Sequence, residues 1–244
     1  MRVKKKSDNQ KPCSGLRKFR QIDAALDRVF KAKNQAALIR AWDRFWVLSG
    51  NDRDDDIYEN VDSLVRALLY RKSRTVLCVG NGLAYEAHAL AHAGFTVDVL
   101  DISPEATHGL RERIPDPVRL QRVLRGESAR PGGTLAIHTG DFRDASLCTG
   151  PFDSIVCRNM LQYLSVEDRP GALAALQQRL SPTGLLVLQG HNAPSFQGPT
   201  CTWLNEHGFA VCINMVVRDG RFHAPTPSAS ALTKQTGWVI RSSG

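Results

Sequence analysis

The sequence has no apolar run of about 18 residues, the length that a membrane-spanning helix needs. It also has no CxxC pair, so its six cysteines lack a spacing typical of zinc or redox sites. No apolar segment follows the basic start Met1–Lys6, and a secretory signal is therefore not expected. These absences favour a cytoplasmic protein whose cysteines are free thiols packed as small hydrophobic side chains.

What the sequence does contain fits one large α/β domain with some additional helices. It has 244 residues, of which 42% are hydrophobic and 23% charged, enough to bury a proper core. The net charge of +8 is unevenly placed, since residues 1–20 carry eight Lys or Arg and one acid. The rest of the chain is nearly neutral. We therefore expect residues 1–20 to be a basic, disordered tail that could touch nucleic acid or an acidic protein.

Residues 21–72 show the spacing of amphipathic helices. One apolar stripe runs from Ile22 to Phe30 and another from Leu38 to Trp46, with Asn34 as a break between them. A further helix is expected to follow the acidic run at residues 52–56 and to end near Tyr70. We interpret residues 21–72 as an N-terminal helical lid over the carboxyl ends of the strands, and residues 73–244 as the main domain.

From Thr75 onward, short apolar runs alternate with helical segments. Such alternation is typical of a doubly wound α/β sheet, whose parallel strands are buried on both faces. The sequence predicts a mostly parallel sheet of seven strands with an antiparallel strand at the C-terminal end. The expected strands lie at 75–79, 96–100, 135–138, 154–157, 185–188, 210–217 and 238–240.

The strongest functional signal is the turn Gly80-Asn81-Gly82 directly after the first strand. Glycines at a strand–helix turn let a ligand approach the backbone closely, and ligands bind at the carboxyl ends of parallel strands. The next strand ends in Asp101, 19 residues after Gly82, where a carboxylate can grip a ribose diol. A dinucleotide is disfavoured because Tyr85 stands where close helix packing requires a third small residue.

With these motifs the chain resembles the class I methyltransferases that use S-adenosylmethionine (SAM). The resemblance covers roughly residues 57–190, and SAM is the cofactor that it implies. It places Gly80, Asn81 and Gly82 at the methionine half of SAM, and the Asp101 carboxylate at the ribose. The further cofactor contacts that it implies are Ile102, Asp141 and Phe142 around the adenine, and Arg158 and Asn159 at the end of the fourth strand.

A narrower resemblance concerns the segment Cys157-Arg158-Asn159-Met160-Leu161-Gln162-Tyr163-Leu164. It is similar to a segment of the chemotaxis-receptor glutamate methyltransferases, in which the tyrosine lies beside the methyl-transfer centre. Tyr163 is therefore a candidate catalytic residue. His191 is a second candidate, because it follows the fifth strand and its unperturbed pKa of about 6.5 suits a general base.

The favoured function is methyl transfer from SAM to a small-molecule acceptor, with Tyr163, His191 and Asn192 lining the acceptor pocket. Three alternatives stay open: a protein or RNA methyltransferase guided by the basic tail, an inactive SAM-binding module, and an enzyme of the same fold that transfers another group, such as aminopropyl. The module is suggested by Cys78 and Ala84, which stand where the family usually has an acid and a glycine. No metal site is predicted, because His88 and His92 have the spacing of metal ligands but no third partner.

Overall fold

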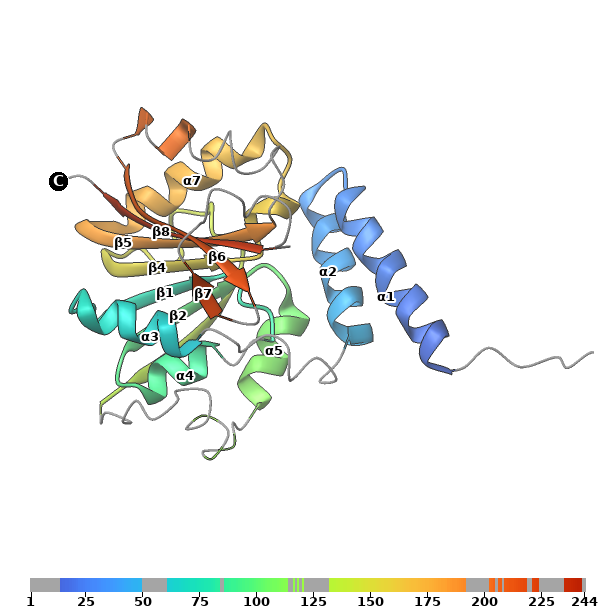
Figure 1. Ribbon diagram of the computed structural model, residues 1–244. Coiled ribbons are helices and arrows are strands. Elements are labelled where there is room, and N and C mark those ends of the chain that lie inside the picture. The colour runs from blue at the N-terminus through green and yellow to red at the C-terminus, as the bar shows by residue number, and fades with distance from the viewer. Residues whose placement is uncertain are drawn as a thin grey trace, which may run out of the picture.

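The computed structural model contains a mixed sheet with helices on both faces and a helical hairpin at one end (Figure 1). The structure describes residues 14–49, 61–83, 86–113, 116, 118, 120, 132–191, 202–204, 206–207, 209–218, 221–223 and 235–242. Across these residues, no helix is long and apolar enough to span a bilayer.

The sheet follows the order β3-β2-β1-β4-β5-β8-β6-β7. Its parallel part consists of β3 (Thr134–Thr139), β2 (Thr96–Asp101), β1 (Thr75–Val79), β4 (Phe152–Arg158) and β5 (Leu180–His191). The remaining strands, β8 (Gln235–Ser242), β6 (Phe209–Arg218) and β7 (Arg221–His223), pair antiparallel. The expected parallel α/β sheet is confirmed. The expected mostly parallel sheet of seven strands is wrong in its count, because the sheet of the described residues has five parallel strands.

Strand β1 shows why this sequence forms a buried central strand. Successive side chains of a strand point to opposite faces, so all four residues of an apolar run can be buried only between two layers. Val76 and Cys78 pack into a core on one face, whereas Leu77 and Val79 pack into a second core on the other. Each fully buried side chain of this size contributes about 1.5–3 kcal/mol to folding.

Helices cover both faces of the parallel strands. On one face lie α3 (Val61–Tyr70), α4 (Glu86–His92) and α5 (Pro104–Glu112), and on the other lies α7 (Asp168–Arg179) (Figure 1). The interpretation of residues 21–72 as one lid is wrong for α3, because Leu64, Val65 and Leu68 are buried in the core of the sheet. An amphipathic helix packs wherever its apolar stripe finds a surface to cover, and the sheet face offers the larger one.

The helical hairpin consists of α1 (Ser14–Phe30) and α2 (Gln35–Ser49), which lie side by side (Figure 1). Ile22 and Ala25 of α1 pack against Phe45 of α2. The predicted break at Asn34 is the start of α2, where the Asn34 side chain accepts a hydrogen bond from the Ala37 amide at 2.9 Å. Because α1 begins at Ser14, the prediction of a disordered tail over residues 1–20 is wrong for its last seven residues. Residues 1–13 lie outside the described part of the chain.

Candidate functional site

The glycine turn and the Asp101 carboxylate lie together at the carboxyl ends of β1 and β2. Gly80 and Gly82 have φ angles of +65° and +56°, a region that residues with a Cβ rarely adopt. The Gly82 amide donates to Asp101 Oδ2 at 2.8 Å, and the Ser103 amide donates to Asp101 Oδ1 at 2.9 Å. Since β1 and β2 are parallel neighbours, an acid at the end of one lies beside the turn after the other.

The Asp101 carboxyl group lies in a poorly solvated position, with only 7% of the residue exposed. Burial raises its pKa, the amides of Ser103 and Gly82 lower it, and the nearby Asp43 raises it; the net shift is upward. Each oxygen of the carboxyl group accepts one hydrogen bond from a backbone amide, and each has a second lone pair that can accept another hydrogen bond. The group can therefore still accept hydrogen bonds from two neighbouring hydroxyls, as a ribose diol requires.

The residues expected around adenine lie beside this carboxylate but differ from one another in exposure. Ile102 follows Asp101 and is half-buried. Asp141 follows β3, and its carboxylate accepts hydrogen bonds from the Arg143 guanidinium. Burial raises the pKa of Asp141, but the Arg143 hydrogen bonds outweigh it and the net pKa is lowered. Phe142 is buried in the core below the sheet, so its ring supports the strand end instead of standing open to a ligand.

A buried ion pair lies at the end of β4. The Arg158 guanidinium contacts the carboxylate of Glu86, the first residue of α4, and also the side-chain oxygen of Gln189 on β5. The Arg158 and Glu86 side chains are only 13% and 6% exposed. Removing one partner of such a pair leaves a buried charge without compensation. Cys78 lies close enough to feel both charges, and burial raises the pKa of its thiol well above the usual value.

Three buried polar atoms on the two amide side chains that follow β4, those of Asn159 and Gln162, lack partners among the described residues. Asn159, with a φ of +52°, directs its backbone amide to Gln189 O at 2.7 Å. Its buried Oδ1 atom, and both polar side-chain atoms of Gln162, have no hydrogen-bond partner among the residues that the structure describes. Buried polar groups are normally paired, so these unpaired atoms are candidates for hydrogen bonds with a polar ligand.

The α1–α2 hairpin reaches the ends of three parallel strands. Asp43 Oδ1 accepts from the Ser103 hydroxyl after β2 at 2.5 Å, and Gln35 Nε2 donates to Asp141 after β3 at 3.4 Å. Trp46 packs directly on Gly82, where an added Cβ would overlap the indole ring. The hairpin therefore covers the glycine turn and the carboxylate.

The candidate catalytic residue Tyr163 lies against the same hairpin. It ends the 3₁₀ turn η2 (Leu161–Tyr163), and its ring centroid lies 5.4 Å from that of Phe30 and 5.0 Å from that of Trp42. His191 ends β5, opposite Gln235 of β8. Its side chain and the whole of Asn192 lie outside what the structure describes, so their suggested places in the pocket stay predictions.

The fold brings three residues to this end of the sheet that the predicted site does not include. Asp43 and Trp46 come from the hairpin, and Gln162 comes from η2. From the sequence, the aromatic cluster of Trp42, Phe45 and Trp46 could line a substrate pocket, but its spacing favours core packing. For Gln162, the only sequence signal for a place in the site is its position three residues after Asn159.

Comparisons with known proteins place the chain among methyltransferases. A family model described as a methyltransferase domain matches residues 51–236, about three quarters of the chain. No curated protein matches the sequence significantly.

Solved structures with the same fold are distant in sequence. One is magnesium protoporphyrin IX methyltransferase from Synechocystis PCC 6803 with bound SAM, at 17% identity and a TM-score of 0.54, covering 95% of this chain and 92% of that one. A second is a SAM-dependent methyltransferase from Clostridium acetobutylicum ATCC 824, at 10% identity and a TM-score of 0.60, covering 83% and 99%. A third is the glycopeptide N-methyltransferase MtfA, at 15% identity and a TM-score of 0.54, covering 75% and 96%.

Proposed function

Since the chain belongs to the class I SAM-dependent methyltransferases, we propose that it methylates a small molecule enclosed beneath the α1–α2 hairpin, which acts as a lid. The observation that carries this proposal is the set of unpartnered buried atoms on Asn159 (Oδ1) and Gln162 (both polar atoms), of which Gln162 is the chain neighbour of Tyr163 beneath the hairpin. A small polar acceptor could satisfy these amides while its carbon skeleton packs against the rings of Phe30, Trp42 and Tyr163.

The site geometry supports the following assignment of cofactor contacts. Asp101 would accept from the ribose hydroxyls, and the backbone of Gly80–Gly82 would lie along the methionine half. Ile102 and Asp141 would flank the adenine, with Phe142 supporting them from below. Arg158 and Asn159 would contact the methionine end, where charged and amide groups can hold a carboxylate and an ammonium group.

SAM supplies a methyl group that is already activated by the adjacent sulfonium. The task left to the protein is therefore to align the acceptor with that methyl group and to exclude water. Trp42 and Tyr163 would form one wall that orients the acceptor. His191 would take the acceptor proton as the new bond forms, if its imidazole is neutral at working pH.

The location of the basic residues and the position of the α1–α2 hairpin favour a small acceptor over a macromolecular one. The basic excess belongs to the first 20 residues, whereas the rest of the chain is nearly neutral. A hairpin lying on the strand ends leaves less room for a folded protein or RNA than for a metabolite. Neighbours with this fold include enzymes named for a porphyrin and for a glycopeptide.

One observation favours the alternative of an inactive module. Trp46 lies on Gly82, and Met160 lies where a Cβ on Gly80 would point, so side chains already contact both glycines. If the hairpin never moves, the methionine half of SAM has no access to the turn. Calorimetry with SAM separates the two cases, because a hairpin that opens permits binding and a fixed one does not.

The acceptor proposal is tested by measuring release of S-adenosylhomocysteine over a panel of small polar aromatic and heterocyclic metabolites. For an accepted substrate, Gln162→Ala should lower kcat/KM about 3- to 10-fold, the value of one neutral hydrogen bond, and leave SAM affinity unchanged. Gln178→Ala, on the exposed face of α7, is the matched control. Equal kcat/KM in both variants would remove Gln162 from the acceptor pocket.

The basic tail is tested separately. Deletion of residues 2–12 should leave turnover of a small acceptor unchanged, because these residues precede α1. A protein or RNA methyltransferase would instead lose substrate affinity on this deletion, and its affinity would become less dependent on salt.

A further inference from the structure

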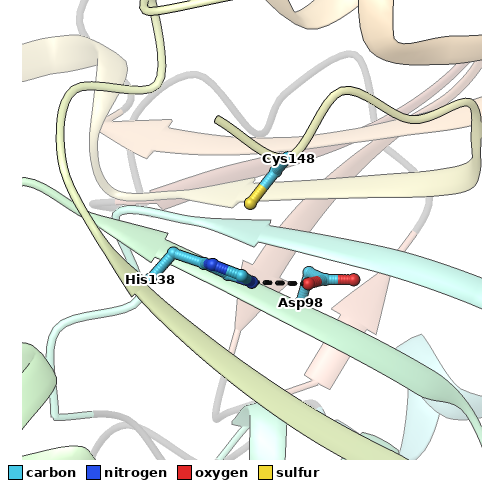
Figure 2. Close-up of side chains that lie close together, drawn as sticks. All are labelled: Asp98, His138 and Cys148. Atoms are coloured by element: carbon cyan, nitrogen blue, oxygen red, sulfur yellow. Dashed lines mark hydrogen bonds and ion pairs between the residues drawn. The ribbon is translucent and has the colours of Figure 1, made fainter. Parts of the chain in front are cut away.

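Three metal-ligating side chains of different chemistry converge on the sheet away from the glycine turn. Asp98 lies on β2, His138 on β3 and Cys148 on the loop before β4, and Figure 2 shows the thiol directed toward the other two. His138 Nε2 lies 2.7 Å from Asp98 Oδ1. One carboxylate oxygen, one imidazole nitrogen and the Cys148 sulfur all lie within 4.8 Å of one another.

The sheet register explains why Asp98 and His138 meet. β2 and β3 are parallel, with Asp98 paired to Ala136 and Leu100 paired to His138. The two side chains are therefore diagonal neighbours on one face, within reach of each other. Their chain neighbours Val97, Val99 and Ile137 point to the opposite face, where they pack into the core.

The third ligand comes from a loop that is anchored from the other side. The guanidinium of Arg179, at the end of α7, donates to the carbonyl oxygens of Asp144, Leu147 and Cys148 at 2.5–3.3 Å. Cys148 has a φ of +48°, which a residue with a Cβ adopts only at a cost. The loop is thus fixed in a conformation that directs a thiol at a histidine–aspartate pair.

We propose that Asp98, His138 and Cys148 bind a zinc-type divalent cation. Thiolate, imidazole and carboxylate are the three side-chain ligands of protein zinc sites, and three protein ligands leave a fourth position for water. Cations that prefer oxygen ligands, such as Mg²⁺ and Ca²⁺, fit this mixed donor set poorly. The cation would replace the proton now shared between His138 and Asp98 and the proton of the thiol.

The observed spacing is close to what a tetrahedral centre needs. Zinc–ligand bonds of about 2.0–2.3 Å place neighbouring ligand atoms roughly 3.3–3.6 Å apart. The His138–Asp98 pair would have to open from 2.7 Å, and the Cys148 sulfur would have to approach from at most 4.8 Å. Both changes are about 1 Å. The side chains are half-buried, with 39% of His138 and 25% of Asp98 exposed, so they can rotate and a cation can reach them.

Such a site would join the β3–β4 loop to the edge of the sheet. The same loop begins with Gly140 and Asp141, and Leu147 packs back onto Gly140. A bound cation would therefore hold the loop that carries the expected adenine contact, without touching the cofactor or the reacting atoms.

The test is metal titration of the full chain after treatment with a chelator and a thiol-free reductant. Zinc competed against a chromophoric chelator should bind with one equivalent, and Co²⁺ should give a thiolate charge-transfer band. Cys148→Ser, His138→Gln and Asp98→Asn should each weaken zinc binding by at least about tenfold, and Cys148→Ser should remove the band. Cys13→Ser and His108→Gln are matched controls that should bind as the wild type does; His108 is exposed on α5.

A second measurement does not depend on whether the variants fold. In the wild-type chain, one equivalent of zinc should protect Cys148 from alkylation, read by peptide mass spectrometry, while leaving Cys13 reactive. Absence of protection, wild-type affinity in folded Cys148→Ser, or loss of binding in Cys13→Ser would each overturn the proposal. In those cases Asp98 and His138 form an ordinary hydrogen bond beside an unrelated thiol.

Discussion

Replacing Asp101 by asparagine tests the central feature of the site, a carboxylate held beside the glycine turn. The substitution preserves shape, but it replaces one of the two acceptor oxygens by an amide donor. That NH₂ group would face the backbone amide of Gly82 or Ser103, which now donate at 2.8 and 2.9 Å. The variant therefore loses an acceptor both for the turn and for the ribose.

The expected magnitude follows from hydrogen bonds to a charged group, which contribute about 1.5–3 kcal/mol each. The variant should lose one hydrogen bond to the ribose and weaken the second. Together these changes should reduce the binding free energy by about 2–4 kcal/mol, which raises the Kd for SAM roughly 30- to 1000-fold. Stability should respond differently. Because burial raises the pKa of Asp101, the ionised group costs stability at neutral pH, and removing its charge partly offsets the lost hydrogen bonds.

The assay is isothermal calorimetry with SAM and with S-adenosylhomocysteine, together with the thermal midpoint of unfolding. Asp27→Asn, on the exposed face of α1, is the control for loss of one negative charge. The thermal midpoint of unfolding should change by only a few degrees, which for a chain of this size corresponds to about 1 kcal/mol in the free energy of unfolding. A folded Asp101→Asn protein that binds SAM within threefold of the wild type would refute the assignment of the carboxylate to the ribose.

Three further predictions concern the same end of the sheet. Gly82→Ala should lower stability by about 1–2 kcal/mol and weaken SAM binding, because its φ is +56° and its Cβ would displace Trp46; urea unfolding and calorimetry measure both. Glu86→Ala should lower the free energy of unfolding by about 3–5 kcal/mol, since it leaves the buried Arg158 charge unpaired, and a much smaller loss in urea would mean that Gln189 suffices as partner. Affinity for SAM should fall as the pH falls through the raised pKa of Asp101, which lies above the usual value of about 3.9. Over the same pH range the free energy of unfolding should rise, because protonation removes the cost of a buried charge. A pH-independent Kd down to the onset of acid unfolding would contradict the last prediction.

Several features of the fold and site were readable from local sequence signals. The run Val76–Val79 indicates a strand buried on both faces, because a short run of consecutive apolar residues is typical of a strand that lies between two layers. Gly80 and Gly82 mark a turn at positive φ, and Asp101 ends the next strand. Once two strands are parallel neighbours, their carboxyl ends must meet, so this part of the site follows from spacing alone.

Other features depended on where separate elements packed. The stripe of α3 looks like those of α1 and α2 in sequence, yet α3 is buried on the sheet and the other two lie on the strand ends. Which surface an amphipathic helix covers depends on the apolar area that the surface offers. A short window of sequence does not contain this information, because the surface is built from distant segments. For this reason the contacts of Asp43 with Ser103 and of Trp46 with Gly82 were not foreseen.

By itself, the sequence determined the parallel α/β sheet, the glycine turn and the acid that faces it, because each depends on residues close in the chain or on neighbouring strands. Only the tertiary structure decided which hairpin residues contact the turn and brought Asp98, His138 and Cys148 within 4.8 Å. The last two are separated from Asp98 by 40 and 50 positions, with no motif to link them. Their meeting depends on sheet register and on a loop held by Arg179, and such long-range contacts form only when the whole core packs.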